Sequence, residues 1–239
     1  MPELPEVETV MRGLTPAMAG TRIVRVEQRR ADLRFPLPPS MPERLAGRRI
    51  ERLSRRAKYI LFHLDKDEVL IAHLGMSGRF TIGARVVAGT AFTQRAGGDP
   101  AHDHIVIHLS NGAVVTYNDP RRFGYMDLIG CQEFDAHKLF RDLGVEPLSN
   151  QFNARHLAAL AASRKVDLKA FLLDQHVVAG VGNIYASEAL FRAGLKPSRM
   201  AATVADRHGA PNARAESIVA AVRGVLTDAI AAGGSSLRD

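Results

Sequence analysis

The stretch that decides the fold of the N-terminal half is the start of the chain, Met1-Pro2-Glu3-Leu4-Pro5-Glu6-Val7-Glu8. The apolar residues that follow it recur at i, i+3, i+4 and i+7, which is one face of a helix: Val7, Val10, Met11 and Leu14. Pro5 suits a first helical turn, and Glu6 suits the positive end of the helix dipole. Chain ends are usually frayed, but this pattern predicts a terminus held by a docked helix.

Removal of Met1 would leave Pro2 with a secondary amine beside Glu3. An α-amino group has a pKa of about 7.7–8.0, so roughly a tenth of it is neutral and nucleophilic at pH 7. Addition of such an amine to an aldehyde-like carbon gives an iminium ion, which acts as an electron sink. The structural alternative is that Pro2 protects the terminus and Glu3 is a first-turn charge. These residues alone favour that alternative.

Composition places the chain among soluble globular proteins, with 239 residues, 46% hydrophobic and 24% charged. No apolar run reaches membrane-spanning length, and the acidic start does not resemble a signal peptide. A net charge of +7 favours a polyanionic partner, although a merely basic protein is an alternative. The single cysteine, Cys131, excludes an internal disulfide and a multi-cysteine zinc site within this chain, and it is consistent with a reducing cytoplasm.

Short β-rich runs dominate the first half of the chain, at residues 21–26, 59–64, 69–74, 105–109 and 113–117. Asn111-Gly112 between the last two predicts a hairpin with a type I′ turn, because both residues tolerate positive φ. Residues 35–39 and 96–100 are expected loops. We expect a β-sandwich with the first helix laid against it.

The hydrophobic period changes to that of helices from about residue 132, with predicted helices at 133–143, 153–163, 168–175, 184–193 and 213–231. Gly144, Gly194 and Gly233 lie where helix C-caps are expected. The predicted class is therefore α+β. We expect an N-terminal domain over residues 1–131 and a helical domain over residues 132–239.

Five ordered blocks give the chain a family resemblance that covers nearly its whole length. The blocks are residues 1–9 (MPELPEVET), 55–59 (RRAKY), 73–78 (HLGMSG), 119–124 (DPRRFG) and 180–188 (GVGNIYASE). Together they resemble formamidopyrimidine-DNA glycosylase, a bacterial repair enzyme of base excision repair. Leu4 and Met76 are similar to the oxidised-purine branch, whereas the related endonuclease VIII branch begins Met-Pro-Glu-Gly-Pro.

The resemblance implies a bifunctional glycosylase and AP lyase that removes 8-oxoguanine and formamidopyrimidines from duplex DNA. Pro2 would attack C1′ of the everted nucleotide, and Glu3 would act as general acid and base around the deoxyribose. Lys58 matches a lysine placed beside the lesion nucleotide and its phosphate, with a part in proton transfer, and Glu6 would support the site. The covalent iminium would then undergo β- and δ-elimination.

A base-everting enzyme must also fill the gap that the nucleotide leaves. Met76, Arg121 and Phe123 match the void-filling residues of the family, with Arg121 facing the orphaned cytosine. Their structural alternatives are a core methionine, a surface arginine and a core phenylalanine.

Contacts to the DNA backbone are implied for His102, Arg164 and Asn183. Residues 180–183 precede a predicted helix start, where backbone N–H groups and the helix dipole favour a phosphate. Asn183 is expected to cap that helix and still reach the backbone. The block resembles the helix–two-turn–helix element of these glycosylases, although a lone Gly-x-Gly is more often a plain turn, and His102 and Arg164 alone would be ordinary surface residues.

The resemblance also predicts features that this sequence lacks. Members of the family continue into a lesion-capping loop and a four-cysteine zinc finger with a further catalytic arginine, so one zinc ion is expected in a full-length member and no cofactor within this chain. Truncation and divergence both explain the difference, and truncation is favoured. The expected partner is double-stranded DNA containing oxidised purines. We expect a monomer with no membrane association, in the bacterial cytoplasm with the nucleoid. A catalytically inactive DNA-binding module, truncated or blocked by Met1, is the alternative, followed by a basic protein with no nucleic-acid role.

Overall fold

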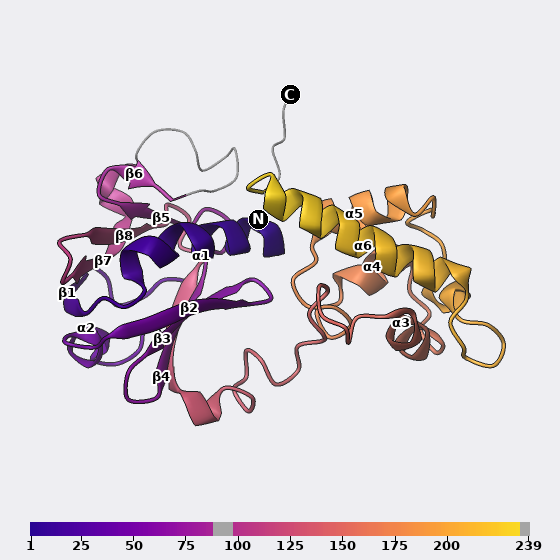
Figure 1. The fold of residues 1–239 in the computed structure, drawn as a ribbon, viewed down its shortest axis with the longest axis horizontal. Coiled ribbons are helices and arrows are strands. Elements are labelled where there is room, and N and C mark those ends of the chain that lie inside the picture. The colour runs from indigo at the N-terminus through magenta and orange to yellow at the C-terminus, as the bar shows by residue number, and fades with distance from the viewer. Residues whose placement is uncertain (88–97, 235–239) are drawn as a thin grey trace. The chain divides into compact units, whose positions relative to one another are not determined.

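The computed structural model describes residues 1–87 and 98–234, which divide into two compact units (Figure 1). Described residues 1–137 and 232–234 form the N-terminal unit, and Lys138–Ala231 forms the helical unit. The expected boundary after Cys131 lies before this division. The His137 side chain pairs with Asp127 at 3.5 Å and so holds the residues after 131 to the N-terminal unit.

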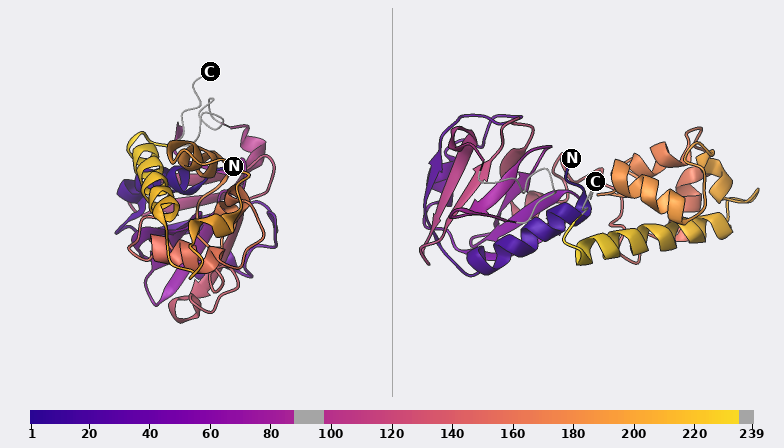
Figure 2. Two further views of the ribbon diagram at one scale, coloured as in Figure 1. Left: turned by 90° about the vertical axis from the view of Figure 1, so that its right-hand side faces the viewer. Right: turned by 90° about the horizontal axis from the view of Figure 1, so that it is seen from above.

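Helix α1 (Leu4–Met18) has the predicted docked face, with Val7, Val10 and Leu14 buried in the core. It packs against strands β2 (Ile50–Arg56) and β3 (Tyr59–Leu64) of the N-terminal unit (Figure 2). Pro5 is in the first turn as predicted, since Leu4 is the first helical residue. The docked N-terminal helix is therefore confirmed.

Two antiparallel sheets build the sandwich of the N-terminal unit. The five-stranded sheet has the order β1-β7-β8-β5-β6, and the four-stranded sheet has the order β2-β3-β4-β9. The remaining strands are β1 (Ile23–Gln28), β4 (Glu68–His73), β5 (Arg79–Ile82), β6 (Arg85–Val86), β7 (Asp103–Leu109), β8 (Val114–Asn118) and β9 (Tyr125–Gly130). Apolar side chains of both sheets and of α1 share one core. The predicted α+β class and sandwich are confirmed.

The β7–β8 hairpin is confirmed, but its predicted type I′ turn is wrong. Gly112 has φ +84°, whereas Asn111 does not have positive φ, and the Gly112 amide donates to Leu109 O at 3.0 Å. This is a type I turn followed by a left-handed glycine. The Asn111 side chain holds that geometry, because it accepts from the Ala113 amide and donates to Ala17 O of α1.

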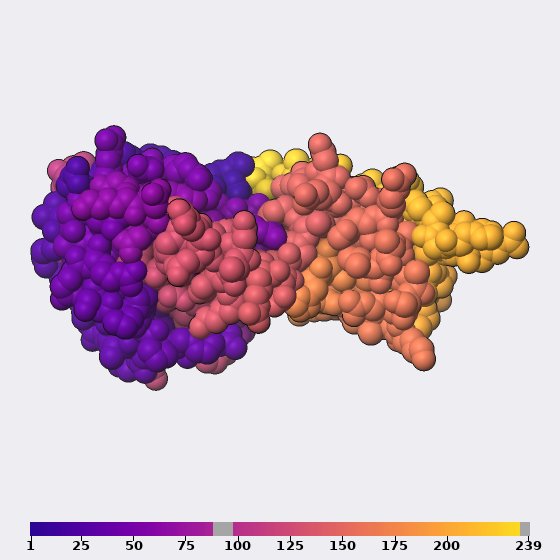
Figure 3. All heavy atoms as spheres, turned by 90° about the horizontal axis from the view of Figure 1, so that it is seen from below, coloured from indigo at the N-terminus to yellow at the C-terminus, as the bar shows by residue number. Residues whose placement is uncertain are grey.

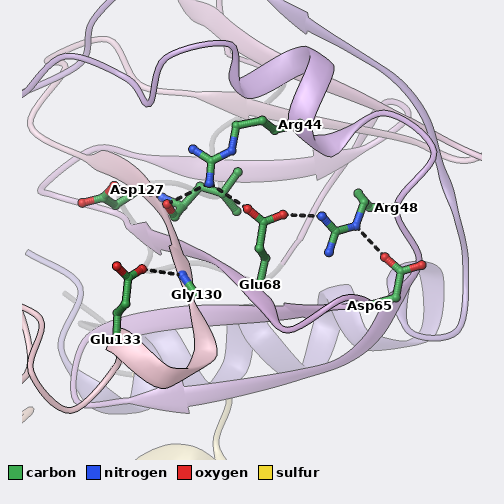
Figure 4. Close-up of polar contacts among 8 residues, drawn as sticks. Arg44, Arg48, Asp65, Glu68, Asp127, Gly130 and Glu133 are labelled. Carbon is green, nitrogen blue, oxygen red and sulfur yellow. Dashed lines mark hydrogen bonds and ion pairs between the residues drawn. The ribbon is translucent and has the colours of Figure 1, made fainter.

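Short helices and an ion-pair network close one edge of the sandwich. Helix α2 (Met41–Leu45) carries Arg44, which donates to Glu68 Oε1 at 2.7 Å (Figure 4). Arg48 bridges Glu68 and Asp65, with its Nε 2.6 Å from Asp65 Oδ1 (Figure 4). The four side chains alternate in charge and tie α2 and the segment after it to β4.

Four of the five predicted helices occur in the helical unit: α3 (Ala154–Ala161), α4 (Leu168–Leu173), α5 (Asn183–Arg192) and α6 (Ala213–Ala231). A 3₁₀ turn, η3 (Ala201–Val204), lies between α5 and α6. Gly194 and Gly233 have φ of +67° and +81° after α5 and α6, as helix-ending glycines do. The apolar faces of these helices share a second core.

The predicted helix over residues 133–143 is wrong. A 3₁₀ turn, η2 (Cys131–Glu133), is followed there by turns in which the amides of Phe134, His137 and Leu143 donate three residues back. Such bonds make turns and not an α-helix. Gly144 therefore ends no helix, and a Cβ at that position would lie 2.5 Å from His176 O. Figure 3 shows the rose-coloured start of this segment at the molecular surface.

The expected loops differ in what the structure describes. The 3₁₀ turn η1 (Pro100–His102) contains Pro100, and residues 98–99 precede it without regular structure. The rest of the expected loop, residues 96–97, lies outside the described residues. Across residues 1–87 and 98–234, no helix combines the length and apolar character that a membrane crossing would need.

Candidate active site and nucleic-acid interface

Three charged side chains are buried together at the start of α1. The exposed fractions of Glu3, Glu6 and Lys58 are 3%, 2% and 8%. Glu3 is the N-cap residue of α1, and its amide donates to Glu6 Oε2 at 2.9 Å. Lys58 is the second residue of the two-residue turn between β2 and β3. The structure therefore brings together the predicted catalytic Glu3 and Lys58 and the predicted supporting Glu6.

The electrostatics of this cluster bear on proton transfer. Burial lowers the pKa of Lys58 below its usual value, and the carboxylates of Glu3 and Glu6 oppose that effect. A lysine whose pKa is lowered releases its proton more easily near neutral pH, as a proton-transfer group must. Glu6 fixes the Glu3 backbone through the capping hydrogen bond, so Glu6 acts on the geometry of Glu3.

Pro2 is buried in the chain that carries Met1, whose own residue is 56% exposed. The Pro2 nitrogen is then part of a tertiary amide and has no nucleophilic lone pair. The expected exposed secondary amine therefore requires a chain that begins at Pro2. In such a chain the amine would be attached directly to Glu3.

His73 lies at the end of β4, between Tyr59 of β3 and Tyr125 of β9 in the sheet. Its ring stacks on Tyr125 with centroids 5.2 Å apart and planes at 15°. Its Nδ1 accepts the Gly75 amide at 3.0 Å, so the ring proton of the neutral form is on Nε2. Burial, followed by the charges of Lys58 and Arg34, lowers the pKa of His73 to about 4. Sequence reasoning included His73 in a block but assigned it no role.

The three predicted void-filling residues lie on two loops of the N-terminal unit. Met76 follows β4, and Arg121 and Phe123 precede β9. Met76 is 43% exposed and Phe123 is 42% exposed, so neither is a core residue. The Arg121 guanidinium lies 4.7 Å from the centroid of the Phe123 ring, a cation–π contact.

His102 is placed beside the second of these loops. Its carbonyl accepts the Asp119 amide at 3.1 Å, and Asp119 begins the segment that carries Arg121 and Phe123. His102 itself is partly exposed at the end of η1. Asp119 was missed as a site residue. The available signal was its place in the fourth block, immediately before a proline.

The glycine segment of the helical unit has the predicted position but not the predicted cap. Gly182 is the N-cap residue of α5 and Asn183 is the first helical residue, so the expectation that Asn183 caps α5 is wrong. Asn183 is exposed. Gln175, which sequence reasoning missed, accepts from the Gly180 amide and donates to Val181 O, each at 2.8 Å. A polar side chain shortly before a glycine turn was the only signal for it.

Arg164 follows α3 in the same unit and is 44% exposed. Its guanidinium pairs with Asp174 Oδ2 at 3.6 Å. An exposed pair of this kind is weak, so the guanidinium can exchange its partner for a phosphate.

The described part of the chain, residues 1–87 and 98–234, contains no group of three His, Cys, Asp or Glu side chains placed to hold a metal ion. The one cysteine, Cys131, is exposed. These residues do not fit the zinc site that the resemblance implies for full-length members, so no chemical step is assigned to zinc.

A sandwich whose first helix presents Pro2, Glu3 and a buried lysine, followed in sequence by a helical unit with a glycine turn before α5, defines a DNA glycosylase of base excision repair. The model of the formamidopyrimidine-DNA glycosylase N-terminal domain matches residues 1–126, and the model of the formamidopyrimidine-DNA glycosylase H2TH domain matches residues 143–239. The chain belongs to the formamidopyrimidine-DNA glycosylase family.

Relatives and solved structures agree with this assignment. Formamidopyrimidine-DNA glycosylase of Azorhizobium caulinodans is 58% identical over all of this chain, which covers 82% of that protein. The crystal structure of the MutM (Fpg) protein of Thermus thermophilus matches with a TM-score of 0.80 and 36% identity, over 100% of this chain and 79% of that one. Lactococcus lactis Fpg in complex with abasic-site DNA matches with a TM-score of 0.81 and 30% identity, over 99% of this chain and 81% of that one.

Proposed function

We propose that this chain, once Met1 is removed, is a bifunctional DNA glycosylase and AP lyase that excises 8-oxoguanine and formamidopyrimidines from duplex DNA. The observation that carries the proposal is the buried cluster of Glu3, Glu6 and Lys58 next to Pro2. In such a cluster a nucleophile, a carboxyl group and a lysine with a lowered pKa serve one everted sugar. The enzyme would act as a monomer on bacterial chromosomal DNA.

In the first step the Pro2 nitrogen forms a bond to C1′, and the glycosidic bond breaks with its electron pair going to the base. Glu3 supplies a proton to O4′ as the sugar ring opens, and the nitrogen and C1′ are then joined as an iminium ion. Loss of a C2′ proton expels the 3′ phosphate, and a second elimination expels the 5′ phosphate. Lys58 would orient the phosphate and take part in proton transfer.

The exposed side chains on the two loops supply the means of holding DNA open. Met76 and Phe123 can wedge into the stack, and Arg121 can face the orphaned base. His102, Arg164 and Asn183 would contact the backbone. Lactococcus lactis Fpg was crystallised with DNA containing an abasic site and with DNA containing Fapy-dG, which supports the same class of ligand here.

The second candidate function is a catalytically inactive DNA-binding module. The observation that favours it is the attachment of Met1, which makes the Pro2 nitrogen an amide and buries Pro2. The two candidates differ in one measurable property, namely the ability to form a covalent bond with an abasic sugar.

Borohydride trapping tests the proposal. A chain that begins at Pro2 should yield a covalent adduct with duplex DNA containing 8-oxoguanine or an abasic site, and mass spectrometry should place the adduct on Pro2. The matched control is the same chain with Met1 retained, which should give none. Pro2→Gly should weaken trapping, and Glu3→Gln should abolish base removal while sparing DNA binding.

Two results would count against the proposal. A processed chain that binds abasic DNA but never forms an adduct supports the inactive module. Normal excision of 8-oxoguanine by Glu3→Gln shows that the role assigned to Glu3 is wrong.

A further inference from the structure

The Asp119 carboxylate lies between the loop that carries Met76 and the loop that carries Arg121 and Phe123. Asp119 is fully buried, with 0% of its surface exposed. Its side chain accepts hydrogen bonds from Ser77 Oγ at 2.5 Å, from the Gly124 amide at 2.8 Å and from the Tyr117 hydroxyl at 3.3 Å. Burial, followed by the Asp119 charge, raises the pKa of Tyr117, which keeps that hydroxyl a donor. A buried carboxylate satisfied in this way rigidifies the groups around it.

Ser77 makes the direct link between the loops. Its hydroxyl donates to Asp119 Oδ1 and accepts the Arg121 amide at 3.2 Å. Ser77 is the neighbour of Met76 in sequence. One hydroxyl group therefore ties the backbone beside Met76 to the backbone of Arg121.

The two loops also touch through glycines that leave no space for side chains. A Cβ at Gly75 would lie 2.3 Å from the Gly124 nitrogen, and Gly75 has φ +62°. A Cβ at Gly124 would lie 1.8 Å from the Tyr117 hydroxyl oxygen. These backbones lie in contact because neither residue has a side chain.

The second loop holds a strained residue between its two exposed side chains. Arg122 has φ +55°, in the left-handed region that side chains rarely adopt, and its amide donates to Asp119 O at 3.1 Å. Such a conformation persists when the surrounding structure over-determines it. Arg121 and Phe123 flank it and stack on each other.

We propose that Asp119 and Ser77 are positioning residues that join the two loops into one preformed wedge. Met76, Arg121 and Phe123 would then enter damaged DNA as a unit, and little ordering would remain to oppose binding. The inference rests on the proposed function, in which these three side chains fill the gap left by the everted nucleotide.

Amide hydrogen exchange in the full chain without DNA gives the first test. Ser77→Ala should increase exchange of the Arg121 amide about fivefold, the factor that corresponds to one hydrogen bond of typical strength. Amides in the middle of β7 should be unaffected. Ser110→Ala is the matched control, because Ser110 Oγ accepts the Arg22 amide at 3.1 Å in the turn after β7. An Arg121 amide that exchanges equally fast in wild type and Ser77→Ala would overturn the link.

A double-variant cycle on DNA binding gives the second test. The quantity measured is the affinity for a duplex with a tetrahydrofuran abasic analogue divided by the affinity for the undamaged duplex. Ser77→Ala should lower this ratio about fivefold by the same hydrogen-bond argument, and Ser110→Ala should leave it unchanged. If Ser77 acts through Arg121, adding Ser77→Ala to Arg121→Ala should lower the ratio no further. Fully additive effects would show that Ser77 does not position Arg121.

The two tests separate failure of the inference from failure of the proposed function. A wild-type chain with no preference for the abasic duplex counts against the proposed function. Hydrogen exchange in the DNA-free chain still decides whether Ser77 holds Arg121.

Discussion

His73 carries no charge at neutral pH, because burial and the nearby Lys58 and Arg34 disfavour its protonated form and lower its pKa to about 4. A neutral imidazole with its proton on Nε2 can donate to a sugar or phosphate oxygen without adding to the positive charge of Lys58. Its stack with Tyr125 and the Gly75 hydrogen bond set the orientation of that donor. The same low pKa couples folding to pH.

We expect His73→Asn to flatten the dependence of stability on pH. In the unfolded chain a histidine takes up a proton below about pH 6.5, whereas folded His73 does so only below about pH 4. Stability is therefore full above pH 6.5 and falls as the pH drops to 4, by up to about 3 kcal/mol from this residue. Asparagine keeps an acceptor near Nδ1 and does not titrate. Urea denaturation at pH 7.5, 6, 5 and 4 measures the effect. A wild-type advantage that stays constant over this range would contradict it.

The α2–β4 edge shows how an element can be held by ion pairs. Arg48 is 12% exposed and Glu68 is 21% exposed, so water screens their interaction less than it does at the surface. Hydrogen bonds from Arg44 and Arg48 outweigh burial and lower the pKa of Glu68. The hydrogen bond from Arg48 likewise lowers the pKa of Asp65. This contribution to stability is present above the ordinary carboxyl pKa and is lost as the pH falls through the lowered values.

Glu68→Gln should destabilise the N-terminal unit by about 2 kcal/mol at pH 7, because it leaves the largely buried Arg48 with one carboxylate. Asp32→Asn is the control. Asp32 also pairs with two arginines, Arg30 and Arg122, but it is 50% exposed, and its loss should cost less than about 0.5 kcal/mol. Thermal unfolding followed by circular dichroism compares the variants. Equal costs for the two would show that burial does not strengthen the network.

At the scale of the whole molecule, the net charge of +7 predicts DNA binding that weakens with salt. A protein that neutralises about six phosphates loses roughly a thousandfold in affinity between 50 and 200 mM salt, because binding releases condensed counterions. This dependence is expected for both the catalytic and the inactive candidate function. It separates them from a basic protein with no nucleic-acid role.

Two single variants should separate charge from hydrogen bonding in the helical unit. Arg164→Ala should reduce the slope of log affinity against log salt by about one, the effect of one phosphate contact, whereas Asn183→Ala should weaken binding and leave the slope unchanged. Fluorescence anisotropy at four salt concentrations measures both slopes. Equal slopes for wild type and Arg164→Ala would show that the Arg164–Asp174 pair persists on DNA.

Local pattern was sufficient for the docked first helix, the β-sandwich, four helices and the Glu3 and Lys58 candidates. Spacing of apolar residues and the placement of glycine act on the backbone within a few residues, so they can be read in sequence. The same kind of signal failed at residues 133–143. There the His137–Asp127 pair and three-residue-back hydrogen bonds give turns where the period predicted a helix.

The sequence by itself determined which segments become helices and strands and which residues could carry covalent chemistry. Only the tertiary structure decided that Lys58 shares a buried site with Glu3 and Glu6, and that Ser77 meets Asp119. These pairs are distant along the chain. They meet because a buried charge or hydroxyl must find a partner when the sheets close around it, and sheet register settles which partner that is.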